Sequence, residues 1–356
     1  MMFKKSLFIF SLFVLTLTLS ACSINFGGSK PPPSDAGVYK SADSGEKWAQ
    51  IKLVPSISGA PGSIANISVM DMEMDPQDNK AIYLGTERSG IYYTYDGGVR
   101  WAKLKGFPNG KVNSIVVDPD NKCIIYATFG KFIKKTTDCG RNWNDIFIED
   151  GGAEITEVAV DFYNTNIIYA GTSKGRLYKS FDQGRKWSTP FNTISGNIVN
   201  ILIDPNDSRI IYFATKKKGI FKSIDAGVSI INLKDNFKDF KGYNDYRDLI
   251  FNPSKQNSMF LLCKYGILKT EDGGESWSAL PLLTSPNQAD IQVIAVDPKN
   301  DKNIFYTTKT TFYKTTNSGS DWKPKKLFST KTPTNFLIDP EDSNIIYMSF
   351  NFPQKK

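Results

Sequence analysis

Short apolar runs separated by turn residues recur along the whole chain. One unit contains a run that ends in Asp (IVNILIDP), a second run with an aromatic residue (IIYFAT) and a third in which apolar and polar residues alternate (GIFKSID). Short runs of this kind, bounded by Gly, Pro, Asn and Asp, are typical of β-strands. We therefore predict a repeat of four short strands, A to D, in which D follows a conserved-looking turn after strand C.

The end of strand A fixes the phase of the repeat. Each first run ends in an Asp or Asn, at intervals of 42 to 48 residues, and an aromatic residue follows eight positions later. The seven pairs are Asp75 and Tyr83, Asp118 and Tyr126, Asp161 and Tyr169, Asp204 and Tyr212, Asn252 and Phe260, Asp297 and Phe305, and Asp339 and Tyr347. This constant spacing predicts a fixed turn between strands A and B, and four strands per repeat are typical of a β-propeller blade.

A second motif lies between strands C and D. The seven copies are SADSGEKW (41–48), TYDGGVRW (94–101), TTDCGRNW (136–143), SFDQGRKW (180–187), SIDAGVSI (223–230), TEDGGESW (270–277) and TTNSGSDW (315–322). Their acidic or amide positions and their Trp positions are Asp43, Trp48, Asp96, Trp101, Asp138, Trp143, Asp182, Trp187, Asp225, Asp272, Trp277, Asn317 and Trp322. All six Trp residues of the chain belong to these copies, and the fifth copy has Ile230 instead.

The motif Ser/Thr-x-Asp-x-Gly-x-x-Trp resembles the Asp-box, or BNR repeat, of sialidases, xyloglucanases, sortilins and photosystem II assembly factors. An Asp side chain can accept hydrogen bonds from amides of its own turn, Gly supplies a positive φ, and Trp anchors the next strand. We therefore expect the box residues to be structural and not to act as catalytic groups or metal ligands.

The two ends of the chain determine the predicted number of blades. The first repeat contains only strands C and D, and the last contains only strands A and B. We predict an all-β, seven-bladed propeller of four-stranded antiparallel blades, closed by pairing of residues 36–52 with residues 334–350. Closure of the ring leaves only short sheet edges exposed.

The N-terminal residues have the pattern of an export signal. Lys4 and Lys5 precede an apolar run at 7–19, which is shorter than a membrane-spanning helix requires. The sequence LSAC at 19–22 resembles the lipobox of bacterial lipoproteins, which implies lipidation of Cys22. An ordinary cleaved signal peptide is the alternative.

This resemblance divides the chain into three parts. It implies a signal peptide at 1–21, a lipidated Cys22 with a Pro- and Gly-rich tether at 22–35, and the propeller at 36–356. The expected location is a bacterial membrane, with the propeller facing the periplasm or the cell exterior.

Composition removes several classes of function. The chain has no His, which excludes imidazole catalysis and His metal ligands, and we expect no metal and no cofactor. The net charge of +8 is mild, and only seven of its 44 basic residues are Arg. Because Arg dominates phosphate and base recognition, we expect the Lys clusters to be solvated and expect no nucleic-acid partner. We also expect a monomer.

Three Cys residues remain after Cys22. Cys123 and Cys139 occupy positions that are polar or small in the other repeats. Cys123 lies at the start of strand B and Cys139 at the end of strand C, and these two points face each other within one blade. They could form a disulfide, which suits an exported protein, or remain unpaired thiols. Cys263 falls within an apolar run, where a buried thiol is expected.

The long D-to-A connection at 231–247 is the first candidate binding site. Phe237, Phe240, Tyr243 and Tyr246 recur every three residues, and Arg247 follows them. These residues could be exposed anchors for a protein or a sugar. Alternatively, they fold back to cover the blade that lacks its box Trp.

The mouth of the central channel is the second candidate site. The positions four residues before the end of each strand A are Asp71, Ser114, Glu157, Asn200, Asp248, Val293 and Asn335. Asp71, Glu157 and Asp248 could supply the acid and the nucleophile of a glycosidase, which needs only two carboxylates. They could equally be polar side chains of a solvated channel.

The functional expectation follows from the residues that are missing. The sequence has no counterpart of the sialidase arginine triad, and the xyloglucanases of this repeat type have two propellers and stack sugars on Trp. The lipobox-like start and single ring resemble the lipoprotein form of the photosystem II assembly factor. We expect a membrane-anchored, non-catalytic binding or assembly scaffold for a protein or a glycan, with glycoside hydrolysis as the alternative.

Overall fold

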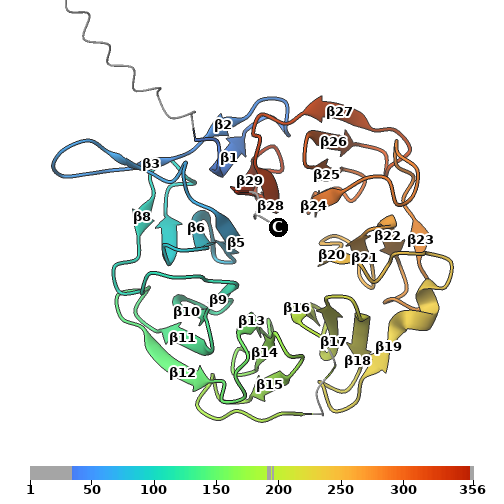
Figure 1. Cartoon of the computed structure of the whole chain (residues 1–356), viewed down its shortest axis with the longest axis horizontal. Coiled ribbons are helices and arrows are strands. Elements are labelled where there is room, and N and C mark those ends of the chain that lie inside the picture. The colour runs from blue at the N-terminus through green and yellow to red at the C-terminus, as the bar shows by residue number, and fades with distance from the viewer. Residues whose placement is uncertain (1–33, 191–193, 195, 353–356) are drawn as a thin grey trace, which may run out of the picture. The chain divides into compact units, whose positions relative to one another are not determined.

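Seven small antiparallel sheets are arranged around a central axis in the computed structural model, which describes residues 34–190, 194 and 196–352 (Figure 1). The predicted all-β, seven-bladed propeller is confirmed. One short 3₁₀ helix, η1 (Leu233–Phe237), interrupts the strands of this described part. None of its helices is long and apolar enough to cross a membrane.

In blades 1 to 6 the strands follow one another outward from the axis in the order of the sequence. Blade 1 consists of β5 (Val69–Asp75), β6 (Asp78–Thr86), β7 (Ile91–Thr94) and β8 (Ala102–Lys103). Blade 2 consists of β9 (Ile115–Asp118), β10 (Asn121–Phe129), β11 (Phe132–Thr136) and β12 (Asn144–Ile148). Blade 3 consists of β13 (Ile155–Val160), β14 (Ile168–Thr172) and β15 (Leu177–Ser180), with a single bridge from Lys179 to Ser188 in place of a fourth strand.

The remaining blades follow the same order. Blade 4 consists of β16 (Ile198–Asp204), β17 (Asp207–Thr215), β18 (Gly219–Ser223) and β19 (Ile231–Asn232). Blade 5 consists of β20 (Tyr246–Phe251), β21 (Met259–Cys263), β22 (Gly266–Thr270) and β23 (Ser278–Ala279). Blade 6 consists of β24 (Ile291–Val296), β25 (Ile304–Thr308), β26 (Thr311–Thr315) and β27 (Lys323–Lys326). A small hairpin of β3 (Leu53–Val54) and β4 (Gly62–Ser63) projects from the ring (Figure 1).

Blade 7 is built from both ends of the described chain, as predicted. It contains β28 (Thr332–Ile338), β29 (Ile346–Asn351), β1 (Gly37–Ser41) and β2 (Ala49–Gln50). The register places Gly37 opposite Phe350 and Ser41 opposite Ile346. In addition, the Ser44 amide donates to the Asn344 carbonyl at 2.9 Å. The first strand pair therefore fills the place of strands C and D in the last blade.

Each Asp box forms a turn with two successive residues at positive φ. The residue after the Asp has φ between +53° and +69°, and the next residue, always Gly, has φ between +85° and +91°. The box Asp or Asn accepts hydrogen bonds of 2.7–2.9 Å from the Ser or Thr hydroxyl and from the amide four residues later. These contacts hold a backbone conformation that only Gly adopts without strain, and they lie within the turn itself.

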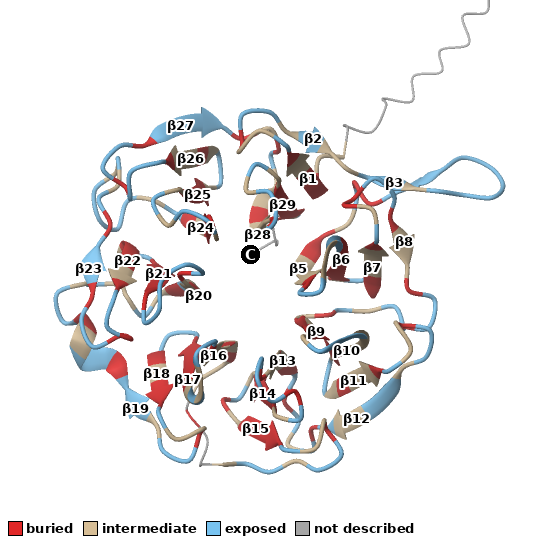
Figure 2. Ribbon diagram, turned by 180° about the vertical axis from the view of Figure 1, so that it is seen from behind, coloured by how far each residue is buried: buried red, intermediate tan, exposed pale blue. Residues whose placement is uncertain are grey.

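The core lies between blades, where the middle strands are buried (Figure 2). The strand-B aromatics are at most 1% exposed; they are Tyr83, Tyr126, Tyr169, Tyr212, Phe260, Phe305 and Tyr347. The indole of each box Trp packs near the previous blade; for example, the Trp101 Nε1 donates to the Ile51 carbonyl at 3.1 Å. Hydrophobic packing between neighbouring blades therefore forms the core of the ring.

Lysine side chains fasten most blades to the next one. In six blades the residue opposite the strand-B aromatic is a Lys, whose ammonium lies 5.0–5.9 Å from the ring centroid. Four of these Lys residues donate to the carbonyl after the box Asp or Asn of the next blade; they are Lys40, Lys135, Lys179 and Lys314. Cation–π attraction and a buried hydrogen bond thus act at the same point.

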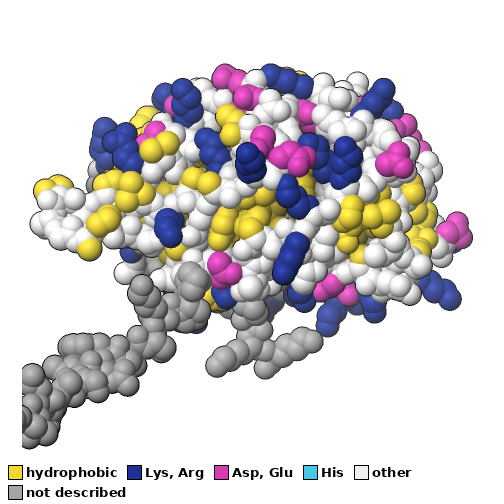
Figure 3. All heavy atoms as spheres, turned by 90° about the horizontal axis from the view of Figure 1, so that it is seen from above, with side chains coloured by type: hydrophobic (Ala, Val, Ile, Leu, Met, Phe, Trp, Pro, Cys, Tyr) yellow, Lys and Arg dark blue, Asp and Glu magenta, His cyan; other side chains and the backbone are white. Residues whose placement is uncertain are grey.

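Charged residues are mixed over the rim. On the side seen in Figure 3, Lys and Arg side chains are interspersed with Asp and Glu, and no single basic surface is formed there.

Closure of the ring can be tested by deletion. Removing residues 36–48 takes away β1, which pairs with β29 along five residues. We expect the truncated protein to lose cooperative unfolding, because blade 7 is left with an open edge. Thermal melts followed by circular dichroism would measure this, with deletion of the exposed loop 56–60 as a control. A truncated protein that melts as sharply as the full chain contradicts the closure.

Candidate functional site

The first strand of each blade lies innermost, next to the axis of the ring (Figure 1). In six blades the predicted channel position lies directly after an irregularity in the register, for example between Val69 and Asp71. Asp71, Glu157 and Asp248 are half-buried there, in blades 1, 3 and 5. Glu73, two residues further along β5, was missed by the sequence prediction.

Several side chains at this position connect neighbouring blades. The Asp71 carboxylate accepts from the Ile115 amide of blade 2 at 2.7 Å and from the Met72 amide at 2.9 Å. Ser114 Oγ lies 3.4 Å from both the Glu157 carboxylate and the Val158 carbonyl of blade 3. The channel residues therefore hold the inner strands together in addition to facing the channel.

The pKa values of the channel carboxyl groups are all raised. Burial raises the pKa of Asp71 and that of Asp248 to about 6, and each carboxylate accepts a backbone amide that opposes the shift. Burial, together with the charge of Asp71, raises the pKa of Glu157 and that of Glu73 well above the usual range. Burial, next to Asp248 and Glu157, likewise raises the pKa of Tyr246. In the described residues no group of His, Cys, Asp and Glu is arranged to hold a metal ion.

The aromatic residues of the 231–247 connection fold back onto the ring. Phe237 and Tyr246 are 1% and 7% exposed, so these two rings follow the second alternative, in which the aromatics fold back, and they are not exposed anchors. Phe237 lies between the rings of Tyr243 and Trp277, with centroids at 4.8 and 5.0 Å. It therefore packs against the box Trp of blade 5 and does not replace the Trp missing from its own blade.

The other three residues of this candidate site are half-buried or already paired. Tyr243 is half-buried and stacks on Phe237. Phe240 is half-buried and stacks edge-on against Tyr265 at 5.1 Å. Arg247 is exposed, and its guanidinium pairs with Asp245 at 3.0 Å and with Asp290 at 3.6 Å.

Cys123 and Cys139 form a disulfide in blade 2. It connects the start of β10 to the box turn, at the point where the Cys139 amide donates to the Cys123 carbonyl at 3.1 Å. Cys263 is a buried free thiol, as expected.

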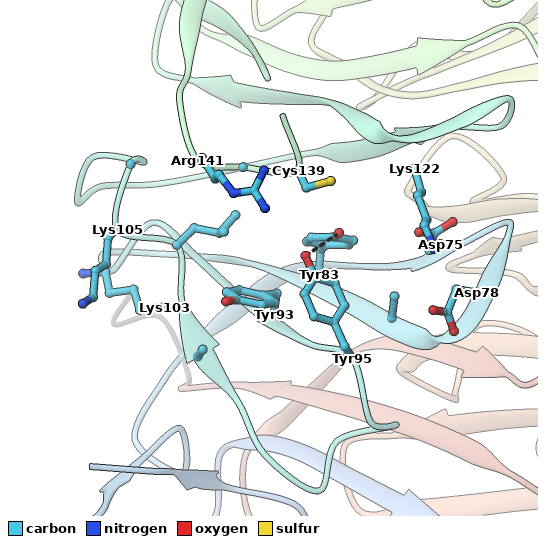
Figure 4. Close-up of a pocket in the computed structure, with 15 residues that line it drawn as sticks. Asp75, Asp78, Tyr83, Tyr93, Tyr95, Lys103, Lys105, Lys122, Cys139 and Arg141 are labelled. Carbon is cyan, nitrogen blue, oxygen red and sulfur yellow. Dashed lines mark hydrogen bonds between the residues drawn. The ribbon is translucent and has the colours of Figure 1, made fainter. Parts of the chain in front are cut away.

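A cavity that the sequence prediction missed lies between blades 1 and 2. It has a volume of about 690 Å³ and is lined by Tyr83, Tyr93 and Tyr95 of blade 1 and by the box turn 139–141 of blade 2 (Figure 4). The Tyr83 and Tyr95 hydroxyls are 3.4 Å apart, and the Tyr93 and Tyr95 rings lie 4.8 Å apart. Tyr95 is 51% exposed, so one ring of this cluster faces solvent.

The cavity lies beside blade 1, in which the Lys opposite the strand-B aromatic is replaced. Tyr93 is paired with Tyr83 at the position where the other six blades have Lys. In blades 3, 4 and 7 the strand-B tyrosine reaches the next box, as in the 2.8 Å bond from the Tyr212 hydroxyl to the Gly273 carbonyl. A comparison of the residues directly before each box Ser or Thr would have shown this exception in the sequence.

Comparison with known proteins identifies the architecture. The family model described as Sortilin, neurotensin receptor 3, matches residues 175–281. Over 121 residues the chain is 30% identical to xyloglucanase Xgh74A of Acetivibrio thermocellus, covering 33% of this chain and 14% of that protein. The chain has the Asp-box propeller fold.

Solved Asp-box propellers superpose on most of the chain. The GH74 enzyme of Niastella koreensis superposes with a TM-score of 0.64 at 18% identity, over 85% of this chain and 53% of that chain. YCF48 bound to a D1 peptide superposes with a TM-score of 0.61 at 14% identity, over 84% of this chain and 95% of that chain. These identities show a shared fold, and the chain spans about half the length of the GH74 structure and less of the curated relative.

The raised pKa of Asp248 predicts a pH-dependent stability. Because its pKa is about 6 in the folded chain and about 3.9 in an unfolded one, the folded state binds the proton more tightly. The free energy of unfolding should therefore fall as the pH rises from about 4 to about 6. We expect Asp248→Asn, which keeps the acceptor for the Leu249 amide, to stabilise the fold at pH 7 by on the order of 1 kcal/mol.

This stabilisation should disappear near pH 4, where Asp248 itself is neutral. Urea denaturation of both proteins at the two pH values measures it. An equal difference at both pH values contradicts the assigned shift.

Proposed function

We propose that this propeller is a non-catalytic binding or assembly scaffold for a protein or a glycan. The observation that carries the proposal is the cavity between blades 1 and 2, in which aromatic rings and basic side chains line a space of about 690 Å³. This volume is in the range of small-ligand sites, and aromatic rings with a few polar groups are their usual lining.

The channel carboxyl groups bear on the alternative of glycoside hydrolysis. A glycosidase needs two carboxyl groups whose pKa values are pushed apart, so that one is protonated and the other is ionised. Burial raises the pKa of Asp71 and that of Asp248 to about 6 and the pKa of Glu157 well above its usual range, so their pKa values differ in the sense that this chemistry needs. The pKa of Tyr246 is also raised, whereas an activated phenol nucleophile needs a lowered one.

The extent of the structural likeness supports the scaffold as well. The chain covers 95% of a YCF48 propeller whose structure contains a D1 peptide, but only 53% of a GH74 enzyme.

We further propose that the propeller is exported and anchored through a lipid on Cys22. The support is the sequence at 1–22, which lies outside the residues that the structure describes. A diacylated Cys gives a nearly irreversible anchor, because each buried CH₂ contributes about 0.8 kcal/mol.

The anchor is tested by labelling. Cells that express the full chain and are fed radiolabelled palmitate should give a labelled, membrane-associated protein, and Cys22→Ser should lose both properties. A Ser23→Ala variant, which leaves Cys22 in place, is the control. Unlabelled wild-type protein in the soluble fraction contradicts the anchor and leaves an ordinary cleaved signal.

Glycoside hydrolysis is the second candidate function. It is favoured by the 30% identity to a xyloglucanase over 121 residues and by the carboxyl groups that face the channel.

A glycan screen separates the two functions. The protein is incubated with xyloglucan and with sialylated host glycans, and the products are monitored by mass spectrometry. We expect no release of reducing ends. Turnover that disappears in Asp71→Asn or Asp248→Asn, while these variants remain folded, would replace the scaffold with a hydrolase. Turnover retained in both variants would point to a contaminating enzyme and keep the scaffold.

A further inference from the structure

We infer that the cavity between blades 1 and 2 binds an acidic oligosaccharide, with a sugar ring against the Tyr cluster and its carboxylate on Arg141. This inference rests on the proposed binding function and names the class of ligand for its site. We call the cavity-lining set of Tyr93, Tyr95 and Arg141 the tyrosine–arginine site.

The first step is the change at Tyr93. In six blades the corresponding side chain is a Lys that fills the space over the strand-B ring, as Lys179 does at 5.0 Å from the Tyr169 ring. With Tyr93 in this position, the ammonium is replaced by a ring that stacks with Tyr83 at 6.4 Å. The site has therefore lost a positive charge and a bond to the next blade, and it has gained an aromatic surface beside a cavity.

The second step is the charge of Arg141. At this box position Glu275 pairs with Lys222 at 2.9 Å and Glu46 lies 3.7 Å from Lys314, so two junctions place an acidic residue against the Lys. Arg141 stands at the same position of blade 2, and its side chain extends over the cavity (Figure 4). No ion pair of Arg141 occurs among the described residues, so its guanidinium is available to a carboxylate, which it can bind through two hydrogen bonds.

The third step is the surrounding charge. The cavity is also lined by Lys103, Lys105 and Lys122. Its acidic lining residues are Asp75 and Asp78. The Asp75 carboxylate already accepts the Gln77 amide at 2.8 Å, and that of Asp78 accepts the Lys80 amide at 3.1 Å. Four basic and two acidic side chains give the lining a net charge of +2, which favours an anionic ligand.

The fourth step is the shape of the surface. A second hollow of about 570 Å³ lies beyond Tyr93 and Tyr95 and shares Lys103 and Lys105 with the first. The exposed Tyr95 ring thus stands between two hollows with basic side chains in common. This arrangement fits a chain of rings that carry regular negative charges.

A sugar fits this site better than a peptide. Recognition of an extended peptide at a sheet edge relies on backbone pairing, but the outer strand of blade 1, β8, has only two residues. The tyrosines instead offer ring faces together with the paired Tyr83 and Tyr95 hydroxyls. Such amphipathic groups match a sugar, which has an apolar face and hydroxyl groups at its edge.

The experiment uses the full-length chain and three matched probes. Isothermal titration calorimetry in about 50 mM salt, where charge effects are weakly screened, would compare a galacturonic acid tetramer, its uncharged methyl ester and a tetraglutamate peptide. We expect the acidic sugar to bind at least about tenfold more tightly than the ester or the peptide. This is the difference expected when one charge-assisted pair with Arg141 is combined with stacking of a sugar ring.

Two substitutions test the residues themselves. The double variant Tyr93→Lys, Arg141→Glu reproduces the lysine–glutamate pair of Lys222 and Glu275, so the chain should fold and lose at least about tenfold in affinity. The control is Arg185→Glu, which changes the same box position in blade 3. Blade 2, which precedes it, has the usual Lys135 opposite its strand-B aromatic, so this variant should bind like the wild type. Far-ultraviolet circular dichroism checks that each variant is folded.

Three results overturn the inference. They are no binding of the acidic tetramer by the wild type, equal binding by the folded double variant, and equal loss in Arg185→Glu. Tighter binding of tetraglutamate than of the sugar assigns the site to an acidic peptide instead. Each of these results leaves the test of hydrolysis untouched, because that test depends on Asp71 and Asp248 in the channel.

Discussion

The structure depends on a turn in which two successive residues at positive φ are held by one side chain. In each Asp box the Asp or Asn binds the Ser or Thr hydroxyl and a later amide, while the residue after it bonds to the start of strand B with a distance of 2.8–3.1 Å. Five of the seven first positions are not Gly, and such residues cost about 1–2 kcal/mol each in this conformation. The hydrogen bonds of the box offset this cost, which explains why the motif is repeated so closely.

The turn also fixes where neighbouring blades meet. Its exposed carbonyl receives a Lys or a Tyr from the blade before, as Ala226 receives both Lys179 at 2.8 Å and Tyr169 at 3.0 Å. Five of the seven turns are held in this way, and the pairing of β1 with β29 completes the ring. At the junction of blades 1 and 2 Tyr93 replaces the Lys, and the cavity lies at this junction. The cavity thus coincides with a local exception to the repeat.

The sequence predicted the features that repetition determines. The box spacing and the incomplete first and last repeats were sufficient for the fold, the blade number and the closure of 36–52 with 334–350. The disulfide of Cys123 and Cys139 was one of two alternatives, because spacing alone cannot show that strand B starts beside the box turn. The buried positions of Phe237 and Tyr246 were not predictable from their period of three, since a 3₁₀ helix turns the first towards Trp277. The tyrosine–arginine site was missed because it requires contacts between blades, although the Lys column that reveals it can be seen by aligning the repeats.

The central claim is that Lys residues opposite the strand-B aromatics fasten most of the blades, and that blade 1 differs by having Tyr93 at this position. The most direct measurement is the free energy of unfolding of Lys179→Tyr and of Tyr93→Lys, by urea denaturation of the wild type and both variants. Lys179→Tyr removes a cation–π contact and a bond to Ala226, so a loss of about 1–2 kcal/mol is predicted. Tyr93→Lys introduces the residue that the other blades have, and its stability should equal or exceed that of the wild type. A stable Lys179→Tyr together with a strongly destabilised Tyr93→Lys would contradict the account.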